Sequence, residues 1–215
     1  MMNVLIVGAN GGIGRILSNQ LSQKKGLNPI ALIRKEEQRS FFDDLGVETR
    51  MGDLEDSVDD LAKVFIDADA IVFTAGSGGS TDYDKTLEID LDAAVKCMEA
   101  AEQKDIDRFI MVSVINADDR KSWNSSPIKP YMIAKYYADQ HLKNSSLKYT
   151  ILRPGRLTDD EGKGEITTSP NEASSNKIPR EDVASVITAS LNNDSTVGKV
   201  FDFVSGDTSI AQAIK

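Results

Sequence analysis

Cysteine and histidine are almost absent from this chain of 215 residues, which has one of each, Cys97 and His141. A single cysteine cannot form an internal disulfide, and its isolation is typical of proteins in a reducing compartment. One cysteine and one histidine are also too few for a zinc site built from these two ligands. We therefore expect a cytoplasmic protein without a metal centre.

Long apolar runs and an excess of basic residues are missing as well. No run approaches the roughly 20 apolar residues of a membrane-spanning helix, and the chain begins with a strand-like run instead of a signal segment. There are 34 acidic and 25 basic residues, a net charge of −9, whereas a nucleic-acid backbone requires a basic face. We expect no membrane segment, no nucleic acid, and one domain over 1–215 that binds a small-molecule substrate.

A glycine-rich turn near the N-terminus is the most informative stretch that the chain does have. The aliphatic run from Val4 to Val7 precedes it, and apolar residues at helical spacing follow it. Helix N-terminal N–H groups and flexible glycines suit a pyrophosphate, whereas a tight turn without a ligand is the alternative. We interpret the turn as a dinucleotide site whose cofactor-binding residues are Gly8, Asn10, Gly11, Gly12, Ile13 and Gly14.

Strand-like runs alternate with helical patterns along the rest of the chain. Strands are expected at 4–7, 28–33, 47–50, 68–73, 108–113, 149–152 and 199–204. This alternation predicts a doubly wound α/β Rossmann fold, a mostly parallel seven-stranded sheet with helices on both faces. The longest helix is expected over 82–104. Residues 158–177, rich in small, polar and acidic residues, are predicted to form a flexible substrate loop in a small C-terminal region that covers the substrate.

Arg34 follows the second strand, where an NAD site normally has a carboxylate that accepts the ribose 2′-hydroxyl. A guanidinium at this point would pair with a 2′-phosphate through charge-assisted bonds. The sequence therefore predicts NADP(H) in preference to NAD(H). The alternative is a solvated basic turn that Glu36 and Glu37 neutralise.

The ends of the third and fourth strands carry further candidate cofactor-binding residues, because ligands of such sheets bind at the carboxyl ends of the strands. Asp53 could accept a hydrogen bond from adenine N6, with Leu54 packing on the ring. A carboxylate at a helix entry is the equal alternative for Asp53. Ala75 and Gly76 would let the cofactor approach without obstruction by side chains.

Ser113, Tyr131 and Lys135 are the candidate catalytic residues. The tyrosine and the lysine share one face of a helix because they are spaced i, i+4. A nearby ammonium is expected to lower the pKa of Tyr131 and so to favour proton transfer, while Lys135 also holds the nicotinamide ribose. Ser113, at the end of the fifth strand, would polarise a carbonyl. The alternative is a chance pattern on a tyrosine-rich helix.

Together these residues resemble the atypical branch of the short-chain dehydrogenase/reductase superfamily. The most similar groups are the NmrA-like and nucleoside-diphosphate-sugar-epimerase-like proteins, related to the flavin and biliverdin reductases. The resemblance rests on the glycine turn, on Leu32–Arg34, Gly52–Leu54, Thr74–Gly76, Asp90, Phe109–Ser113, Tyr131 with Lys135, and Leu152–Gly155. It implies that Asp90 lies near the site and that Pro154 and Gly155 border the nicotinamide.

The resemblance also implies a function, for which three possibilities remain open. The first is an NADP(H)-binding oxidoreductase that transfers hydride to a small carbonyl, quinone or flavin-like acceptor. The second is a regulatory protein that senses NADP without catalysis, and the third is an NAD(P)-dependent sugar epimerase or dehydratase. The chain is short for a nucleotide-sugar enzyme with a sizeable substrate domain. A monomer or a homodimer is expected.

Overall fold

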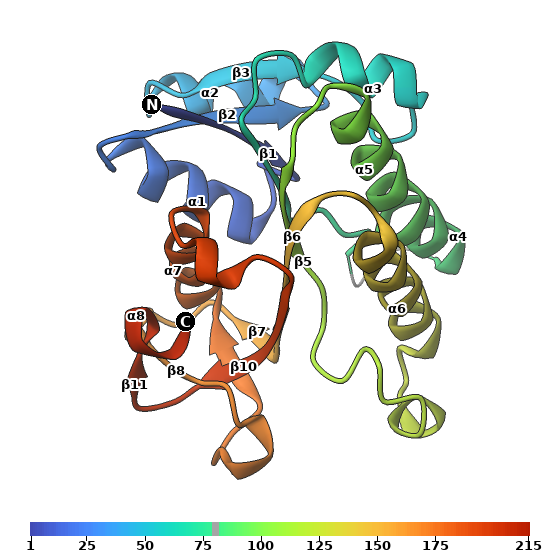
Figure 1. The fold of residues 1–215 in the computed structure, drawn as a ribbon, viewed down its shortest axis with the longest axis vertical. Coiled ribbons are helices and arrows are strands. Elements are labelled where there is room, and N and C mark those ends of the chain that lie inside the picture. The colour runs from blue at the N-terminus through green and yellow to red at the C-terminus, as the bar shows by residue number, and fades with distance from the viewer. Residues whose placement is uncertain (79–81) are drawn as a thin grey trace.

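A computed structural model describes residues 1–78 and 82–215 as a layered α/β fold (Figure 1). The strands are β1 (Met2–Val7), β2 (Leu27–Ile33), β3 (Glu48–Met51), β4 (Ala70–Phe73), β5 (Arg108–Val112), β6 (Lys148–Pro154), β7 (Arg156–Thr158), β8 (Glu165–Thr167), β9 (Lys177–Pro179), β10 (Lys199–Ser205) and β11 (Thr208–Ser209). The α-helices are α1 (Gly12–Ser22), α2 (Arg39–Asp43), α3 (Val58–Val64), α4 (Tyr83–Lys85), α5 (Ala93–Gln103), α6 (Lys129–Asn144), α7 (Arg180–Leu191) and α8 (Ile210–Ala213). Gly79, Ser80 and Thr81, which the sequence places in a loop at the substrate pocket, lie outside the described residues.

The central sheet has the strand order β11-β8-β10-β6-β5-β4-β1-β2-β3. The seven strands from β10 to β3 are parallel and correspond to the predicted ones. The predicted total of seven is wrong, because β8 pairs antiparallel with β10 and β11 and extends the sheet to nine strands. Strands as short as β8 and β11 leave no alternation pattern in the sequence. A separate parallel pair joins β7 to β9.

The direction of winding reverses between β1 and β4, which are neighbours in the sheet although β2 and β3 separate them in the chain. Thr74, just after β4, donates its backbone N–H to the carbonyl of Val7 at 2.8 Å. The segments that follow β1 and β4 therefore leave the same edge of the sheet side by side. Such a switch point forms the crevice in which doubly wound sheets bind their ligands.

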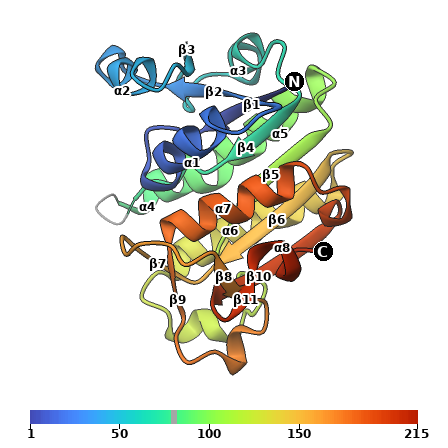
Figure 2. The same ribbon diagram turned by 90° about the vertical axis from the view of Figure 1, so that its left-hand side faces the viewer.

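Helices cover both faces of the sheet, as the sequence predicts. The helices α1 and α7 lie side by side on one face (Figure 2), and α3, α5 and α6 lie on the other (Figure 1). Successive residues of β1 point to opposite faces. Val4 and Ile6 pack in the core beneath α1 and α7, whereas Leu5 and Val7 pack in the core beneath α3, α5 and α6. Both faces are thus buried, which explains the continuous aliphatic run.

The helical segment expected over 82–104 is interrupted by a π-helix, Thr86–Asp92, between α4 and α5. A π-helix closes its hydrogen bonds over one more residue than an α-helix, and such segments are frequent at functional sites. Here it buries Thr86 and Asp90, while Leu87 remains exposed. The π-helix therefore determines which side chains of this segment are buried.

The segment 158–177 contains more regular structure than a loop. It includes β8 and a 3₁₀ turn, Pro170–Glu172, and its ends overlap β7 and β9. The buried carboxylate of Asp182 on α7 accepts the backbone N–H groups of Lys163 at 3.2 Å and Gly164 at 2.8 Å. Part of the segment is therefore tied to α7. Its flexibility and its role over a substrate stay predictions.

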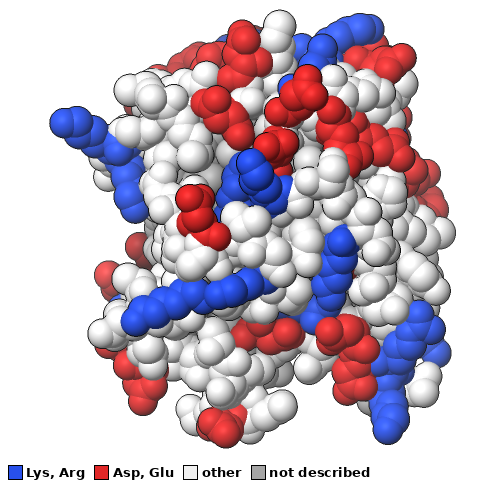
Figure 3. All heavy atoms as spheres, in the orientation of Figure 1, with Lys and Arg blue, Asp and Glu red and all other residues white. Residues whose placement is uncertain are grey.

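The charge of the surface and the apolar character of the helices concern two expected absences, of a nucleic-acid partner and of a membrane segment. On the face drawn in Figure 3, acidic and basic side chains are interspersed among uncharged ones. Within the described part of the chain, no helix combines the length and the apolar character needed to cross a membrane. The absence of a nucleic-acid partner and the cytoplasmic location stay predictions.

Candidate active site

The glycine turn after β1 packs the backbone closely enough to exclude side chains. Gly8 has φ +84°, a left-handed conformation that glycine adopts without strain, and a Cβ there would lie 2.6 Å from the backbone nitrogen of Ala75. Gly14 lies beneath the turn, where a Cβ would come within 2.3 Å of the carbonyl oxygen of Gly8. The first turn of α1 contains no acidic residue. Its N–H groups and positive dipole end therefore form a cradle suited to an anion.

A cleft of about 1210 Å³ extends from this turn along the carboxyl ends of the strands; we call it the strand-end cleft. The predicted residues that line it are Gly8, Asn10, Gly11, Gly12, Ile13, Arg34, Asp53, Leu54, Ala75, Gly76, Ser113, Tyr131, Lys135, Pro154 and Gly155. Gly14 is the exception, because it is buried under the turn and serves its packing. The structure thus gathers into one cleft residues from the ends of six strands, and their roles in binding and catalysis stay predictions.

Arg34 occupies one end of the strand-end cleft and is exposed. Its backbone N–H donates to Oε1 of Gln38 at 2.9 Å, which fixes the turn after β2. Glu36 pairs with Arg39 and not with Arg34. Among the described residues no carboxylate lies within ion-pair distance of the Arg34 guanidinium. The alternative of a solvated basic turn stays open because Arg34 is exposed, but neither Glu36 nor Glu37 forms an ion pair with it among the described residues.

Several other predicted residues of the cleft also have structural roles. Asp53 Oδ1 accepts the backbone N–H of Glu55 at 3.1 Å, which makes it part of the turn before α3. Leu54 is half-buried and packs against the core on the α3 side. Gly155 is required where it stands, since a Cβ would lie 2.2 Å from the carbonyl oxygen of Asn176. Asp53 thus stabilises the turn before α3. It also lines the cleft, and its role in binding adenine stays a prediction.

Ser113, Tyr131 and Lys135 come together at the other end of the strand-end cleft. Ser113 directly follows β5 and is 3% exposed, while Tyr131 and Lys135 project from the first turns of α6. Lys135 Nζ donates to the carbonyl of Val112 at 3.3 Å and lies 5.7 Å from the centre of the Tyr131 ring. Both side chains of the pattern Tyr-x-x-x-Lys line the cleft, and their role in catalysis stays a prediction.

Asp90 is buried behind this end of the cleft, beside Lys135. Its Oδ1 lies 3.3 Å from Lys135 Nζ, and both side chains are buried. Its Oδ2 accepts the Ser77 hydroxyl at 2.8 Å and the Ser77 backbone N–H at 3.1 Å. A Cβ on Gly76 would approach Oδ1 to 3.1 Å, so a glycine here leaves room for the carboxylate. The position of Asp90 agrees with the one that the family resemblance implies.

Burial and neighbouring charges shift the pKa values of Tyr131 and Lys135. Burial raises the pKa of Tyr131; Lys135 opposes the rise, and Asp90 and Asp139 add to it. Burial lowers the pKa of Lys135, but the negative charges of the phenolate that Tyr131 forms in alkaline solution and of the Asp90 carboxylate outweigh it, and the net shift is upward. Lys135 thus lowers the pKa of Tyr131, as expected, but burial outweighs this effect in the protein alone. The further lowering that a positively charged nicotinamide would cause stays a prediction. Tyr131 is a neutral phenol and Lys135 an ammonium at neutral pH.

Apolar side chains form much of the cleft lining that the sequence did not identify. They are Tyr83, Ile89, Val114, Pro127, Ile128 and Leu157, and the polar Ser77, Asp82 and Thr86 line the cleft with them. Tyr83 and Ile128 are exposed at 63% and 48%, large values for apolar side chains. Lys85, the nearby cation, is already paired with Glu55 and Glu88. This part of the lining is suited to an uncharged or apolar group.

Asp139 and Arg153 form a buried ion pair behind the site, and neither is among the predicted site residues. Asp139 lies one helical turn beyond Lys135. Its Oδ2 accepts a hydrogen bond from Nε of Arg153 at 2.9 Å. Arg153 is 1% exposed and also contacts Asp118 at 2.8 Å. Burial raises the pKa of Asp139, against the opposing effect of Arg153 and of the nearby Ser113 hydroxyl. The i, i+4 spacing from Lys135 was the signal that could have found Asp139.

Arg180 is a second residue that the sequence does not identify as part of the site. It is the first residue of α7. Its side chain nevertheless lines the strand-end cleft and crosses over Gly12. No local pattern could have revealed this contact, because α1 and α7 come from opposite ends of the chain.

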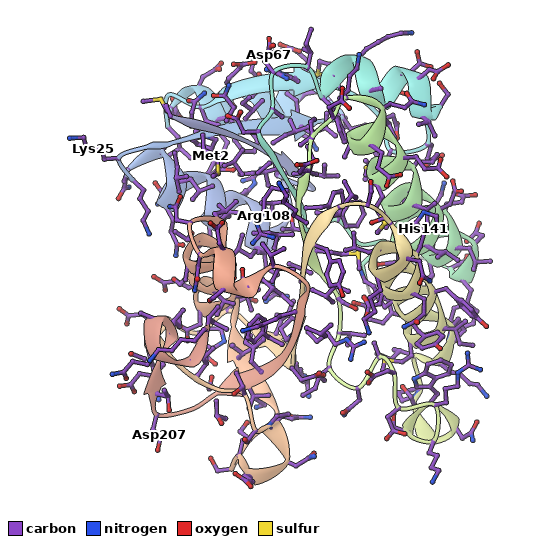
Figure 4. All side chains as sticks on the ribbon, viewed as in Figure 1. Met2, Lys25, Asp67, Arg108, His141 and Asp207 are labelled. Atoms are coloured by element: carbon purple, nitrogen blue, oxygen red, sulfur yellow. The ribbon has the colours of Figure 1, made fainter. Side chains whose placement is uncertain are left out.

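Trp123 and His141 lie outside the site. Trp123 packs edge-on against Tyr136 with ring centres 5.4 Å apart and is 6% exposed, so it anchors the loop before α6. His141 is exposed on α6 (Figure 4). The single cysteine, Cys97, is buried in the core, where burial raises its pKa.

Comparisons with known proteins agree with this geometry. The model of a family described as NAD(P)H-binding matches residues 8–194. The uncharacterized sugar epimerase YhfK of Bacillus subtilis is 44% identical over 214 residues, which cover 100% of this chain and 99% of that protein. The solved structure of a putative NAD-dependent epimerase/dehydratase from Bacillus halodurans is 42% identical, with a TM-score of 0.91 over 100% of this chain and 99% of the other. The structure of the oxidoreductase ylbE from Lactococcus lactis is 33% identical, with a TM-score of 0.87 over 99% and 95% of the two chains.

Proposed function

Because the chain belongs to the NAD(P)H-binding family, which the match over residues 8–194 establishes, we propose that it is an NADP(H)-dependent oxidoreductase. Its substrate would be a small, largely apolar carbonyl, quinone or flavin-like acceptor. One observation carries the proposal: a single cleft has an anion cradle and Arg34 at one end and Ser113, Tyr131 and Lys135 at the other. This is the order of groups that a dinucleotide and an acceptor placed end to end would require.

The residues of the cleft fit the cofactor. At the glycine turn a Cβ on Gly8 would clash with the backbone of Ala75, so the turn can pack closely, and the first turn of α1 would present N–H groups to a pyrophosphate. Arg34 has a guanidinium that no described carboxylate neutralises, which supports a preference for the 2′-phosphate of NADP(H). Ala75 and Gly76 leave the cleft between these two ends free of large side chains.

The groups around Tyr131 support a reduction. NADPH, when bound, would supply the hydride. The phenol of Tyr131, neutral because burial raises its pKa, would donate the proton that the reduced acceptor takes up. Ser113 would polarise the acceptor through its hydroxyl, and Lys135 would keep a positive charge beside Tyr131 and the ribose hydroxyls.

The lining of the cleft favours an apolar acceptor over a nucleotide sugar. A nucleotide sugar carries a diphosphate, which proteins hold with cations or helix N-termini. At the Tyr131 end the described cations are Lys135, paired with Asp90, and Lys85, paired with two glutamates. The relatives' names are divided between epimerase and oxidoreductase, so they do not decide the question.

The test is a titration with NADPH and NADH followed by turnover with an acceptor panel of quinones, flavins, aldehydes and ketones. We expect tighter binding of NADPH and its net oxidation with at least one apolar acceptor. Nucleotide that copurifies with the protein and is not consumed would instead indicate an epimerase or dehydratase. Tight NADP(H) binding without turnover, together with a stable protein partner, would indicate a regulator that senses NADP.

A further inference from the structure

Arg180 lies across the glycine turn although 168 positions separate it from Gly12. A Cβ on Gly12 would come within 2.8 Å of Arg180 Cδ and 3.0 Å of its Nε. The side chain is 28% exposed and lines the strand-end cleft. The stem of Arg180 is therefore packed against the start of α1, and its guanidinium lies beside the N–H groups that form the anion cradle.

The guanidinium is held by one of its three nitrogens. Nη1 donates to Oδ1 of Asp159 at 2.6 Å, and Asp159 is 90% exposed in the segment after β7. Within residues 1–78 and 82–215, Nε and Nη2 make no hydrogen bond. These two nitrogens form the side of the guanidinium that presents two parallel N–H groups, the arrangement that binds a phosphate in a bidentate manner.

The other cations that line the described part of the cleft are either paired with carboxylates or distant from the glycine turn. Lys135 is buried against Asp90, and Lys85 is paired with two glutamates. Arg34 follows β2, on the far side of β1 from the Tyr131 end. A dinucleotide pyrophosphate carries about two negative charges, and Arg180 is the cleft cation that packs on the glycine turn.

We propose that Arg180 is a pyrophosphate-binding residue, which clamps the cofactor from above while the N–H groups of α1 hold it from below. This inference rests on the proposed cofactor site and adds to it a contact from the C-terminal part of the chain. Asp159 accepts a hydrogen bond from Nη1, which leaves Nε, beside Gly12, and Nη2 to bind the phosphate oxygens. The segment after β7 is thereby linked to the dinucleotide end of the cleft.

The experiment compares NADPH and NADH binding, by fluorescence titration, to the wild type and to Arg180→Met and Arg34→Ala. Methionine keeps an apolar stem over Gly12 and removes the guanidinium. Because the pyrophosphate is common to both nucleotides, Arg180→Met should weaken both by the same factor, about 10- to 100-fold for a lost charge-assisted bond. Arg34→Ala should weaken NADPH alone. Arg180→Lys, which keeps the charge without the paired N–H groups, should fall between wild type and Arg180→Met.

Lys163→Ala is the matched control, because it removes an exposed positive charge from the same segment outside the cleft. It should leave both affinities within about twofold of the wild type. Thermal unfolding without nucleotide shows whether each variant is folded. Wild-type protein that binds neither nucleotide overturns the proposed function and this inference with it. Wild-type protein that binds while a folded Arg180→Met binds equally well overturns the role of Arg180 alone.

Discussion

Lys135 and Asp90 form a buried ion pair, with 3.3 Å between Nζ and Oδ1 and with side chains that are 3% and 0% exposed. The pair joins α6 to the π-helical segment Thr86–Asp92 and stands directly behind Tyr131. A buried charge that loses its partner costs far more than the pair contributes. The pair therefore constrains both the stability of the chain and the charge around the phenol.

Asp90→Asn is expected to destabilise the protein strongly. The substitution keeps the shape of the side chain but leaves the Lys135 ammonium without its counter-charge, at a cost of about 3–5 kcal/mol in the free energy of unfolding. Urea denaturation measures the effect. Asp92→Asn is the control, because this carboxylate is 63% exposed and pairs with Lys96 at the surface, where the loss should stay below about 1 kcal/mol. Equal losses in the two variants would contradict the importance of burial.

Tyr131→Phe is expected to lower kcat about 10²- to 10⁴-fold while leaving the affinity for NADPH within about twofold, because it removes a proton donor and not a phosphate contact. Steady-state oxidation of NADPH with the best acceptor measures the first quantity, and nucleotide titration the second. Tyr137→Phe provides the control on the same helix, since Tyr137 is 48% exposed and lies outside the cleft. Full turnover by Tyr131→Phe would remove the tyrosine from the chemistry.

Arg34→Ala is expected to weaken NADPH binding about 10- to 100-fold and to leave NADH binding unchanged, because only NADPH has the 2′-phosphate that the guanidinium would pair with. Isothermal titration with both nucleotides measures the ratio. Lys25→Ala is the control: it removes one positive charge from the turn before β2, at the opposite end of that strand (Figure 4). An unchanged ratio in Arg34→Ala would show that selectivity arises elsewhere.

The raised pKa of Tyr131 predicts a loss of stability in alkaline solution. Above its ordinary value of 10.0 the unfolded chain loses the phenolic proton while the folded protein still holds it. The unfolded state then binds fewer protons, so the free energy of unfolding falls as the pH rises from about 10 toward the folded pKa. Lys135, whose pKa is also raised, adds to the fall with the same sign.

Tyr131→Phe isolates the contribution of the phenol to this alkaline loss. Chemical denaturation at several pH values between about 9 and 11 should show a smaller fall for the variant than for the wild type, while below about pH 9 the two curves should run parallel. Curves that stay parallel over the whole range would mean that the phenol titrates at its ordinary pKa.

Local patterns in the sequence were sufficient to predict the parallel strands and many of the residues that line the strand-end cleft. Aliphatic runs predict buried strands because both faces of each strand are covered. The glycine turn and Arg34 could be identified because each depends on its place directly after a strand. The short strands β8 and β11 could not, since two or three residues form a strand only when a neighbouring edge is there to pair with them.

The sequence by itself thus determined the order of strands and helices and which residues stand at the carboxyl ends of the strands, because periodicity and glycine content act over a few residues. Only the tertiary structure decided what meets those residues. It brings Asp90 to Lys135 through a π-helix, packs Arg180 over Gly12, and surrounds Tyr131 so that burial raises its pKa against the effect of Lys135. Such contacts depend on the packing of distant elements, and burial is a property of the whole fold.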